Sequence, residues 1–265
     1  MIYSINMVLL GALYAGGLFL GILLTIQAGR FLRTRQSGDA CEVAHPGLRA
    51  LEGALFGLMS LILAFSFSGA GTRFDSRRQL LVDEANCIGT AYLRLDVFRA
   101  EAQKVLKAEF RQYADARLSA FRAIPDIQKA EVEVKRAIAI QNRIWERAVA
   151  AIHEANEPQA AMIVVLPALN EMFDIANTQY MATRIHPPAV IYGLMGVLIL
   201  VCALLVGYRM GESKTTSWVH ILSFAGLLAL TFYVTLDMEF PRLGLIQIRN
   251  FDQALVDVRN SMGEG

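Results

Sequence analysis

Two groups of neighbouring carboxylates are the first candidates for chemistry in this sequence, Asp83 with Glu84 and Asp237 with Glu239. Paired carboxylates hold hard cations, because these cations prefer oxygen ligands. A nearby arginine satisfies the same carboxylates by forming an ion pair. The nearest candidates for that role are Arg77, Arg78 and Arg242. Both interpretations are compatible with the sequence, and the ion pair is the more common arrangement.

The four histidines give no second site of this kind. They are spread along the chain, at His45, His153, His186 and His220, too far apart to form a local metal pair. The sequence also contains no glycine-rich phosphate loop, no H-E-x-x-H and no G-x-S-x-G. We therefore expect no catalytic, cofactor or metal site, and we do not expect an enzyme. His186 and His220 flank apolar stretches and are expected at a membrane boundary.

The chain that carries these residues is strongly apolar. Hydrophobic residues make up 55% of it, charged residues 18%, and the net charge is +1, which gives no basic field for a nucleic-acid partner. Four stretches of about 20 or more residues lack Asp, Glu, Lys and Arg, and about 20 apolar residues suffice to cross a bilayer as a helix. Four in one chain favour membrane spans over core helices of a soluble protein. The predicted spans cover about 5–28, 51–72, 187–208 and 217–237.

The long polar segment 73–186 separates the second span from the third. Its apolar residues recur every three or four positions, which predicts amphipathic helices. Three such stripes follow one another, at 81–113, 127–152 and 162–180. No proline or glycine pair lies between Arg73 and Ile88, so we expect the second span to continue out of the membrane as one long helix. The sequence thus predicts an all-α membrane protein with domains 1–72, 73–186 and 187–238 and a C-terminal tail at 239–265.

The second span changes character along its length. Its first half is apolar, and its second half is small and hydroxylic, with Ser66, Ser68, Gly69, Ala70, Gly71 and Thr72. A helix that lines a wet cavity tolerates such a run, and so does a helix buried among close neighbours. G-x-x-x-G spacing marks close helix packing at Gly17 and Gly21 in the first span, and at Gly53 and Gly57 in the second. These motifs do not distinguish packing within a subunit from packing between subunits.

Residues 60–96 resemble the bestrophin channels, and more closely the bacterial bestrophin-like family of membrane proteins. Bestrophins carry a Ser-Phe-x-Leu-Gly-Phe core followed by Thr-Arg and aromatics. The residues on this pattern are Ser60, Leu63, Ala64, Phe65, Thr72, Arg73 and Phe74. The stretch 236–248, with Pro241 and Gly244, is similar to the bestrophin Pro-Phe-Gly region. Asp75 replaces a bestrophin tryptophan, and the tail has no dense acidic cluster that would form a calcium clasp.

The resemblance implies an ion channel of the bacterial inner membrane, with the lipid bilayer and inorganic ions as its partners. It implies a homopentamer whose central pore is lined by the second span, with a hydrophobic neck at Gly57, Leu61 and Phe65. The polar residues that follow, Ser66, Ser68 and Thr72, are expected to line a cavity. Vestibule or structural roles are expected for Arg73, Phe74 and Arg77.

The resemblance also places 73–184 in the cytoplasm, which the basic residues flanking the spans leave undecided, six against six. The alternative function is a non-conducting membrane scaffold or sensor whose helical domain binds a partner.

Overall fold

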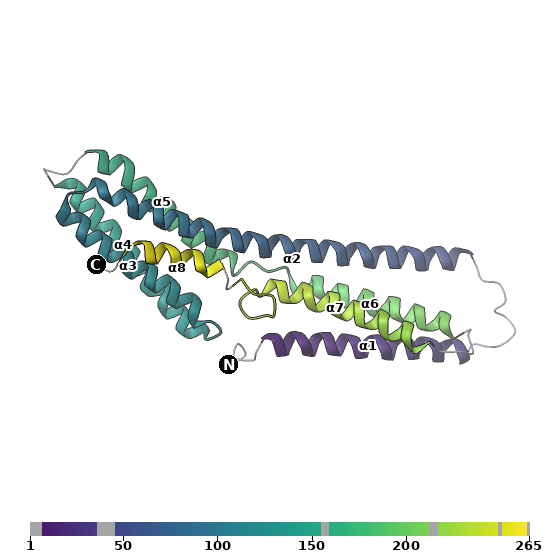
Figure 1. Ribbon diagram of the computed structural model, residues 1–265. Coiled ribbons are helices and arrows are strands. Elements are labelled where there is room, and N and C mark those ends of the chain that lie inside the picture. The colour runs from purple at the N-terminus through teal and green to yellow at the C-terminus, as the bar shows by residue number, and fades with distance from the viewer. Residues whose placement is uncertain (1–6, 36–45, 155–158, 212–216, 249–250, 264–265) are drawn as a thin grey trace. The chain divides into compact units, whose positions relative to one another are not determined.

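The computed structural model describes residues 7–35, 46–154, 159–211, 217–248 and 251–263, and within these ranges the chain is helical with no strand (Figure 1). The predicted all-α class is therefore confirmed. The helices are α1 (Met7–Arg35), α2 (Pro46–Arg94), α3 (Ala100–Ala123), α4 (Ile127–His153), α5 (Gln159–Ala182), α6 (Ala189–Met210), α7 (Trp218–Glu239) and α8 (Asp252–Ser261). One compact unit holds Phe74–Ile185 and Pro241–Gly265, and the other holds Ile5–Arg73 and His186–Phe240.

Helix α2 runs without interruption from Pro46 to Arg94. The expectation that the second apolar span continues as one long helix is confirmed. The prediction that the stripe from Leu81 to Tyr113 lies on a single helix is wrong, because α2 gives way to a 3-10 turn, η1 (Leu95–Val97), before α3 begins.

Local hydrogen bonds stabilise that break between α2 and α3. Phe98 and Arg99 both adopt extended backbone conformations, and the Phe98 N–H donates to the Leu95 carbonyl at 3.0 Å. The Asp96 side chain accepts a hydrogen bond from Gln103 Nε2 at 2.7 Å, so it bonds to the first turns of α3. The sequence has no proline or glycine at this point from which the break could be predicted.

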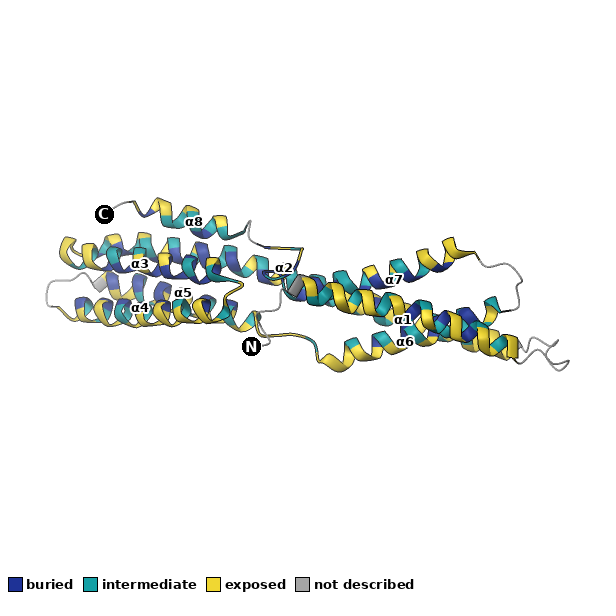
Figure 2. Ribbon diagram, turned by 90° about the horizontal axis from the view of Figure 1, so that it is seen from below, coloured by how far each residue is buried: buried dark blue, intermediate teal, exposed yellow. Residues whose placement is uncertain are grey.

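The first unit has a closely packed apolar core. Helices α3 and α4 lie side by side, joined by a short turn at Ile124-Pro125 in which Asp126 caps α4 by accepting from the Lys129 N–H at 3.1 Å. Figure 2 shows the dark-blue buried faces of these helices. Large side chains from four helices fill the core, namely Ile88 of α2, Phe110 and Tyr113 of α3, Ile140 and Ile144 of α4, and Leu169 and Met172 of α5.

A polar network is enclosed in that core. Glu84 accepts two hydrogen bonds from the Arg117 guanidinium, the Nη2–Oε2 distance being 2.9 Å, and Arg117 Nη2 also donates to Gln179 Oε1 at 3.0 Å. Burial alone would lower the pKa of Arg117, but the charge of Glu84 more than offsets it, and the pKa is raised. The carboxylate of Glu84 is thus satisfied by an arginine, although by none of the three candidates named from the sequence.

In the second unit, α1 packs against α6 and α7. The closest approach is between α1 and α6, where a Cβ on Gly207 would overlap the Ile26 carbonyl and a Cβ on Gly29 would overlap that of Leu204. Only glycine lets the two backbones come this near. The predicted packing motif of α1 is less closely engaged, since a Cβ on Gly21 would meet Leu200 at 3.2 Å and one on Gly17 would meet nothing within 4 Å.

Five described helices are long and apolar enough to cross a membrane, namely α1, α2, α5, α6 and α7. The four predicted spans correspond to α1, the first part of α2, α6 and α7. Helix α5 is the least apolar of the five, and its Val165, Leu169 and Met172 belong to the core of the first unit. The layout of four spans with one inserted domain therefore remains a prediction.

The contact between α1 and α6 gives a stability test. Gly207→Ala places a methyl group against backbone, so we expect it to destabilise the protein by about 1–3 kcal/mol, as overpacking does. Gly193→Ala on the same helix meets nothing within 4 Å and serves as the matched control, with an unchanged or slightly raised Tm. Thermal unfolding in detergent measures both, and equal Tm values would contradict the assigned contact.

Candidate functional site on the second helix

One face of α2 in the second unit is exposed in the part of the chain that the structure describes. Gly57, Leu61, Phe65, Ser68 and Thr72 follow one another at steps of three or four residues, which keeps them on one side of a helix. All five are exposed, and the exposed fraction is 51% for Leu61 and 69% for Phe65. The residues predicted from the resemblance to form a neck therefore share one exposed face of α2.

The opposite side of α2 makes the contacts within the unit. Met59 and Leu63 are buried there and join the apolar cluster that contains Ile22 of α1 and Ile199 of α6. Ser66 lies toward this side and is half-buried. Of the three predicted cavity residues, the structure thus places Ser68 and Thr72 on the exposed face and Ser66 away from it.

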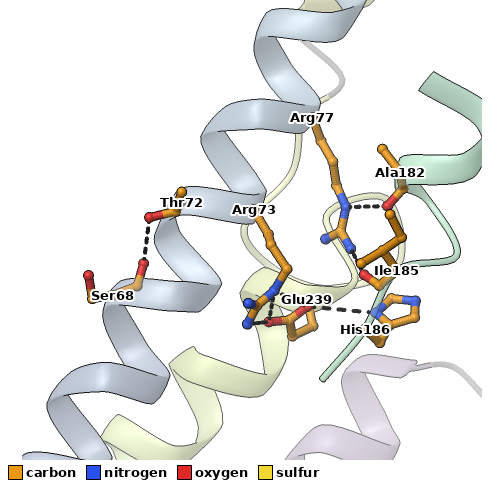
Figure 3. A network of polar contacts seen from close by, with 8 residues as sticks. All are labelled: Ser68, Thr72, Arg73, Arg77, Ala182, Ile185, His186 and Glu239. Carbon is orange, nitrogen blue, oxygen red and sulfur yellow. Dashed lines mark hydrogen bonds and ion pairs between the residues drawn. The ribbon is translucent and has the colours of Figure 1, made fainter. Parts of the chain in front are cut away.

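Hydrogen bonding orients the hydroxyl group of Thr72. Its Oγ1 donates to the Ser68 carbonyl one turn earlier, at 3.0 Å (Figure 3). The hydroxyl proton is therefore used within the helix. A Cβ built on Gly53 or Gly57 would meet nothing within 4 Å, so the G-x-x-x-G motif of α2 makes no close contact with the described part of its own chain.

An ion pair lies at the end of the second unit, where Arg73 meets Glu239, the last residue of α7 (Figure 3). Arg73 Nε donates to Glu239 Oε1 at 2.9 Å, and Nη2 makes a second bond to the same oxygen. Glu239 is only 1% exposed, whereas Arg73 is about a third exposed. This carboxylate is paired with an arginine, as the more common arrangement predicted, but the partner is Arg73, 166 positions away.

A histidine adjoins the same carboxylate. His186 Nδ1 is 3.6 Å from Glu239 Oε2, and the imidazole stacks on the Phe240 ring with centroids 4.8 Å apart. His186 lies shortly before the start of α6, and its expected position at a membrane boundary remains a prediction. Spacing along the sequence gave no signal for the group, because its members come from three separate segments.

The other two residues with predicted vestibule or structural roles, Arg77 and Phe74, make contacts within the first unit. Arg77 is 5% exposed, and its guanidinium donates to two carbonyls at the end of α5, Nε to Ala182 at 3.1 Å and Nη2 to Ile185 at 2.9 Å (Figure 3). A cation at a helix C-terminus satisfies unpaired carbonyls and the helix dipole. Phe74 packs against the apolar core of the first unit. Neither residue presents its side chain to open space.

Comparison with known protein families identifies the family of this chain. The profile of the Bestrophin-like domain matches residues 16–250, most of the chain. The chain belongs to the bestrophin-like family. The resemblance identified in residues 60–96 is thereby confirmed, and the family together with the apolar helices identifies a membrane protein.

The fold has a solved counterpart. A bacterial bestrophin homolog from Klebsiella pneumoniae, crystallised with a tyrosine-to-alanine mutation, superposes with a TM-score of 0.66 at 12% identity, covering 92% of this chain and 99% of that one. At this identity the similarity shows the fold alone. A search of curated proteins gives no match. In the parts of the chain that the structure describes, no group of three or more His, Cys, Asp or Glu residues could hold a metal ion.

Removing the buried carboxylate tests the Arg73 ion pair. Glu239→Gln leaves the guanidinium without its counter-charge, and we expect a loss of about 2 kcal/mol, less than for a fully buried pair because Arg73 is partly exposed. Glu52→Gln is the control in the same unit, since Glu52 pairs with a half-exposed Arg209 and should contribute less than about 1 kcal/mol. Equal shifts in Tm for the two variants would show that the buried pair contributes no more to stability than the exposed one.

Proposed function

We propose that this bestrophin-like protein is a pentameric ion channel of the bacterial inner membrane, with α2 of each subunit lining a central pore. The exposed face of α2 is the observation that carries the proposal. It changes from apolar at Leu61 and Phe65 to hydroxylic at Ser68 and Thr72, all on one side of the helix. A pore wall requires such a face, whereas a scaffold does not.

The neck would work by excluding water. A narrow ring of apolar side chains resists ions because water leaves an apolar constriction. Gly57 has no side chain to narrow the ring, so Leu61 and Phe65 form the constriction. The hydroxyl groups one and two turns further on provide a wettable surface where the pathway widens.

The surface of α2 also supports assembly from several copies. Within its apolar window only 6% of the residues are buried in the chain, the smallest share among the candidate spans. Gly53 and Gly57 leave room for another backbone. In Figure 2 the helices of the second unit carry many yellow, exposed positions. Exposed apolar side chains such as Leu24 of α1 and Val219 of α7 suit contact with lipid. In a pentamer, α2 would be covered by neighbouring subunits, and the other helices would face the lipid.

The proposed topology has four crossings, with both termini and residues 73–184 in the cytoplasm. Helix α5 stays outside the bilayer in this arrangement. Its apolar side chains support that placement, because they fill a core shared with α3 and α4 and do not form a continuous lipid-facing surface.

The neck is tested by truncation. The double variant Leu61→Ala plus Phe65→Ala should raise ion flux several-fold or more in liposomes, because a wider constriction stays wet. Phe67→Ala is the matched control, since Phe67 is an exposed aromatic residue of the same helix that lies off this face. All proteins are first shown to form the same oligomer in detergent. Negligible flux from both the parent and the double variant would contradict the channel and favour a scaffold or sensor.

Cysteine labelling of intact cells tests the topology, in a background without the native cysteines. Asn142→Cys lies on an exposed position of α4 and should stay unlabelled by a membrane-impermeant reagent until the cells are permeabilised. Gly47→Cys, exposed at the start of α2, should label from outside and is the positive control. Strong external labelling at position 142 would reverse the proposed orientation without changing the number of crossings.

A further inference from the structure

One end of the second unit is rich in arginine. Helices α1 and α6 end there, and α2 and α7 begin there (Figure 1). The arginine cluster consists of Arg30, Arg33 and Arg35 of α1, Arg49 of α2 and Arg209 of α6. The described residues of these helix ends, 30–35, 46–52, 208–211 and 217–220, contain one carboxylate, Glu52, which pairs with Arg209 at 3.2 Å. With the connecting segments included, residues 30–52 and 209–217 hold six basic and four acidic side chains, a net charge of +2.

Close backbone contact fixes part of the arginine cluster. A Cβ built on Gly211, just after α6, would lie 2.7 Å from the Cβ of Arg33 and 3.1 Å from the Arg30 carbonyl oxygen. The end of α6 therefore stays against the last turns of α1, and Arg33 meets Tyr208. The Arg33 guanidinium lies 5.3 Å from the centroid of the Tyr208 ring, and its Nη1 donates to the Tyr208 hydroxyl at 3.4 Å. Stacking of this kind holds an arginine at a fixed place on the surface.

Two arginines of the cluster have no counter-charge in the described chain. Arg30 is half-buried and Arg49 is exposed. Neither side chain makes a hydrogen bond or an ion pair with the residues that the structure describes. A half-buried cation without a counter-charge is unfavourable, so an anion from outside the chain would stabilise Arg30 in particular.

The helix dipole does not explain these two positions. Cations in the last turn of a helix are stabilised by its dipole, which accounts for Arg33 and Arg35. Arg30 precedes that turn, and Arg49 lies in the first turn of α2, where the dipole disfavours a cation. Arg30 is also three residues before Arg33, and like charges at this spacing on a helix repel each other. The arrangement is therefore better suited to an external anion than to the chain's own charges.

Exposed apolar side chains lie next to these arginines. They are Phe31 and Leu32 of α1, Leu48 and Leu51 of α2, and Trp218 of α7, each at least 45% exposed. Tryptophan is typical of the membrane–water interface, and arginines there keep their charged ends at the headgroups while apolar neighbours meet acyl chains. A soluble anion would gain nothing from the apolar side chains. The combination therefore points to a lipid as the source of the anion.

We infer that this end of the second unit binds the headgroup phosphates of anionic phospholipids, with Arg30 and Arg49 as phosphate ligands. A guanidinium donates two parallel N–H bonds to phosphate oxygens. Each basic residue at a membrane surface raises the affinity for anionic lipid about fivefold. The inference is independent of the proposed channel, because it requires neither a pore nor a particular orientation in the membrane.

Lipid binding by the full chain in detergent tests this inference, with phosphatidylglycerol and phosphatidylcholine as probes. Native mass spectrometry counts the bound lipids. We expect the affinity for phosphatidylglycerol to exceed that for phosphatidylcholine about tenfold or more at low salt. Arg30→Gln plus Arg49→Gln should reduce this ratio to about two or less. Lys104→Gln plus Arg122→Gln removes two exposed cations of the first unit and is the charge-matched control, with an unchanged ratio.

A variant with a gain in binding complements the loss. Glu52→Gln removes the carboxylate that pairs with Arg209, so the ratio should rise about twofold to fivefold. Thermal unfolding and size-exclusion profiles in phosphatidylcholine verify that all variants keep the fold and assemble alike.

Each other outcome overturns the inference. Equal affinities for the two lipids in the parent protein would show that the arginine cluster has no preference for anionic headgroups. A ratio that survives Arg30→Gln plus Arg49→Gln, or that falls equally in the control pair, would place the binding elsewhere. Inorganic phosphate or a soluble acidic peptide that raises the Tm as much as phosphatidylglycerol would show that the cluster takes a soluble anion. None of these results bears on ion flux, which the neck variant tests separately.

Discussion

The rest of the structure depends on the backbone hydrogen bonds of α2, which continue without a break from Pro46 to Arg94. An α-helix satisfies its own N–H and C=O groups, so one such element suits both hydrocarbon and water. At 1.5 Å per residue this helix is roughly 70 Å long, more than twice the thickness of a hydrocarbon core. Part of it must therefore be surrounded by other protein or by water. The sequence of α2 agrees with this requirement, because its apolar first half is followed by a half rich in charged and amide side chains.

Charged groups that cannot reach water are bound by opposite charges or by backbone. Glu84 is enclosed with Arg117, and Glu239 with Arg73, in separate units of the chain. Such pairs add little net stability over apolar packing, but losing one partner leaves the other charge exposed to an apolar environment. Their main effect is to restrict which helix faces can meet. The charges that remain solvated are then concentrated on the surfaces that the chain leaves uncovered.

The sequence was sufficient for features determined by local spacing. The unbroken passage from the second span into the polar segment follows from the absence of helix breakers. The common face of Leu61 and Phe65 follows from their spacing of four residues. The end of α2 at Arg94 was missed because Asp96 acts through bonds to residues that only the folded chain brings near. Gly207 was missed because it occurs in no motif. Only the folded structure shows that a side chain at this position would overlap the backbone of Ile26. The neck itself and the four-span layout remain predictions.

The contact of Arg77 with α5 differs in kind from the ion pair that Arg73 of α2 makes with Glu239. Its two acceptors are main-chain carbonyls of Ala182 and Ile185, so the bond does not depend on which side chains stand at those positions. Mutational drift there leaves the junction intact, whereas a change at position 77 has no compensating change elsewhere. An arginine tied to backbone is therefore expected to stay fixed over evolutionary time while the residues it contacts vary freely, leaving no covarying pair to reveal their proximity.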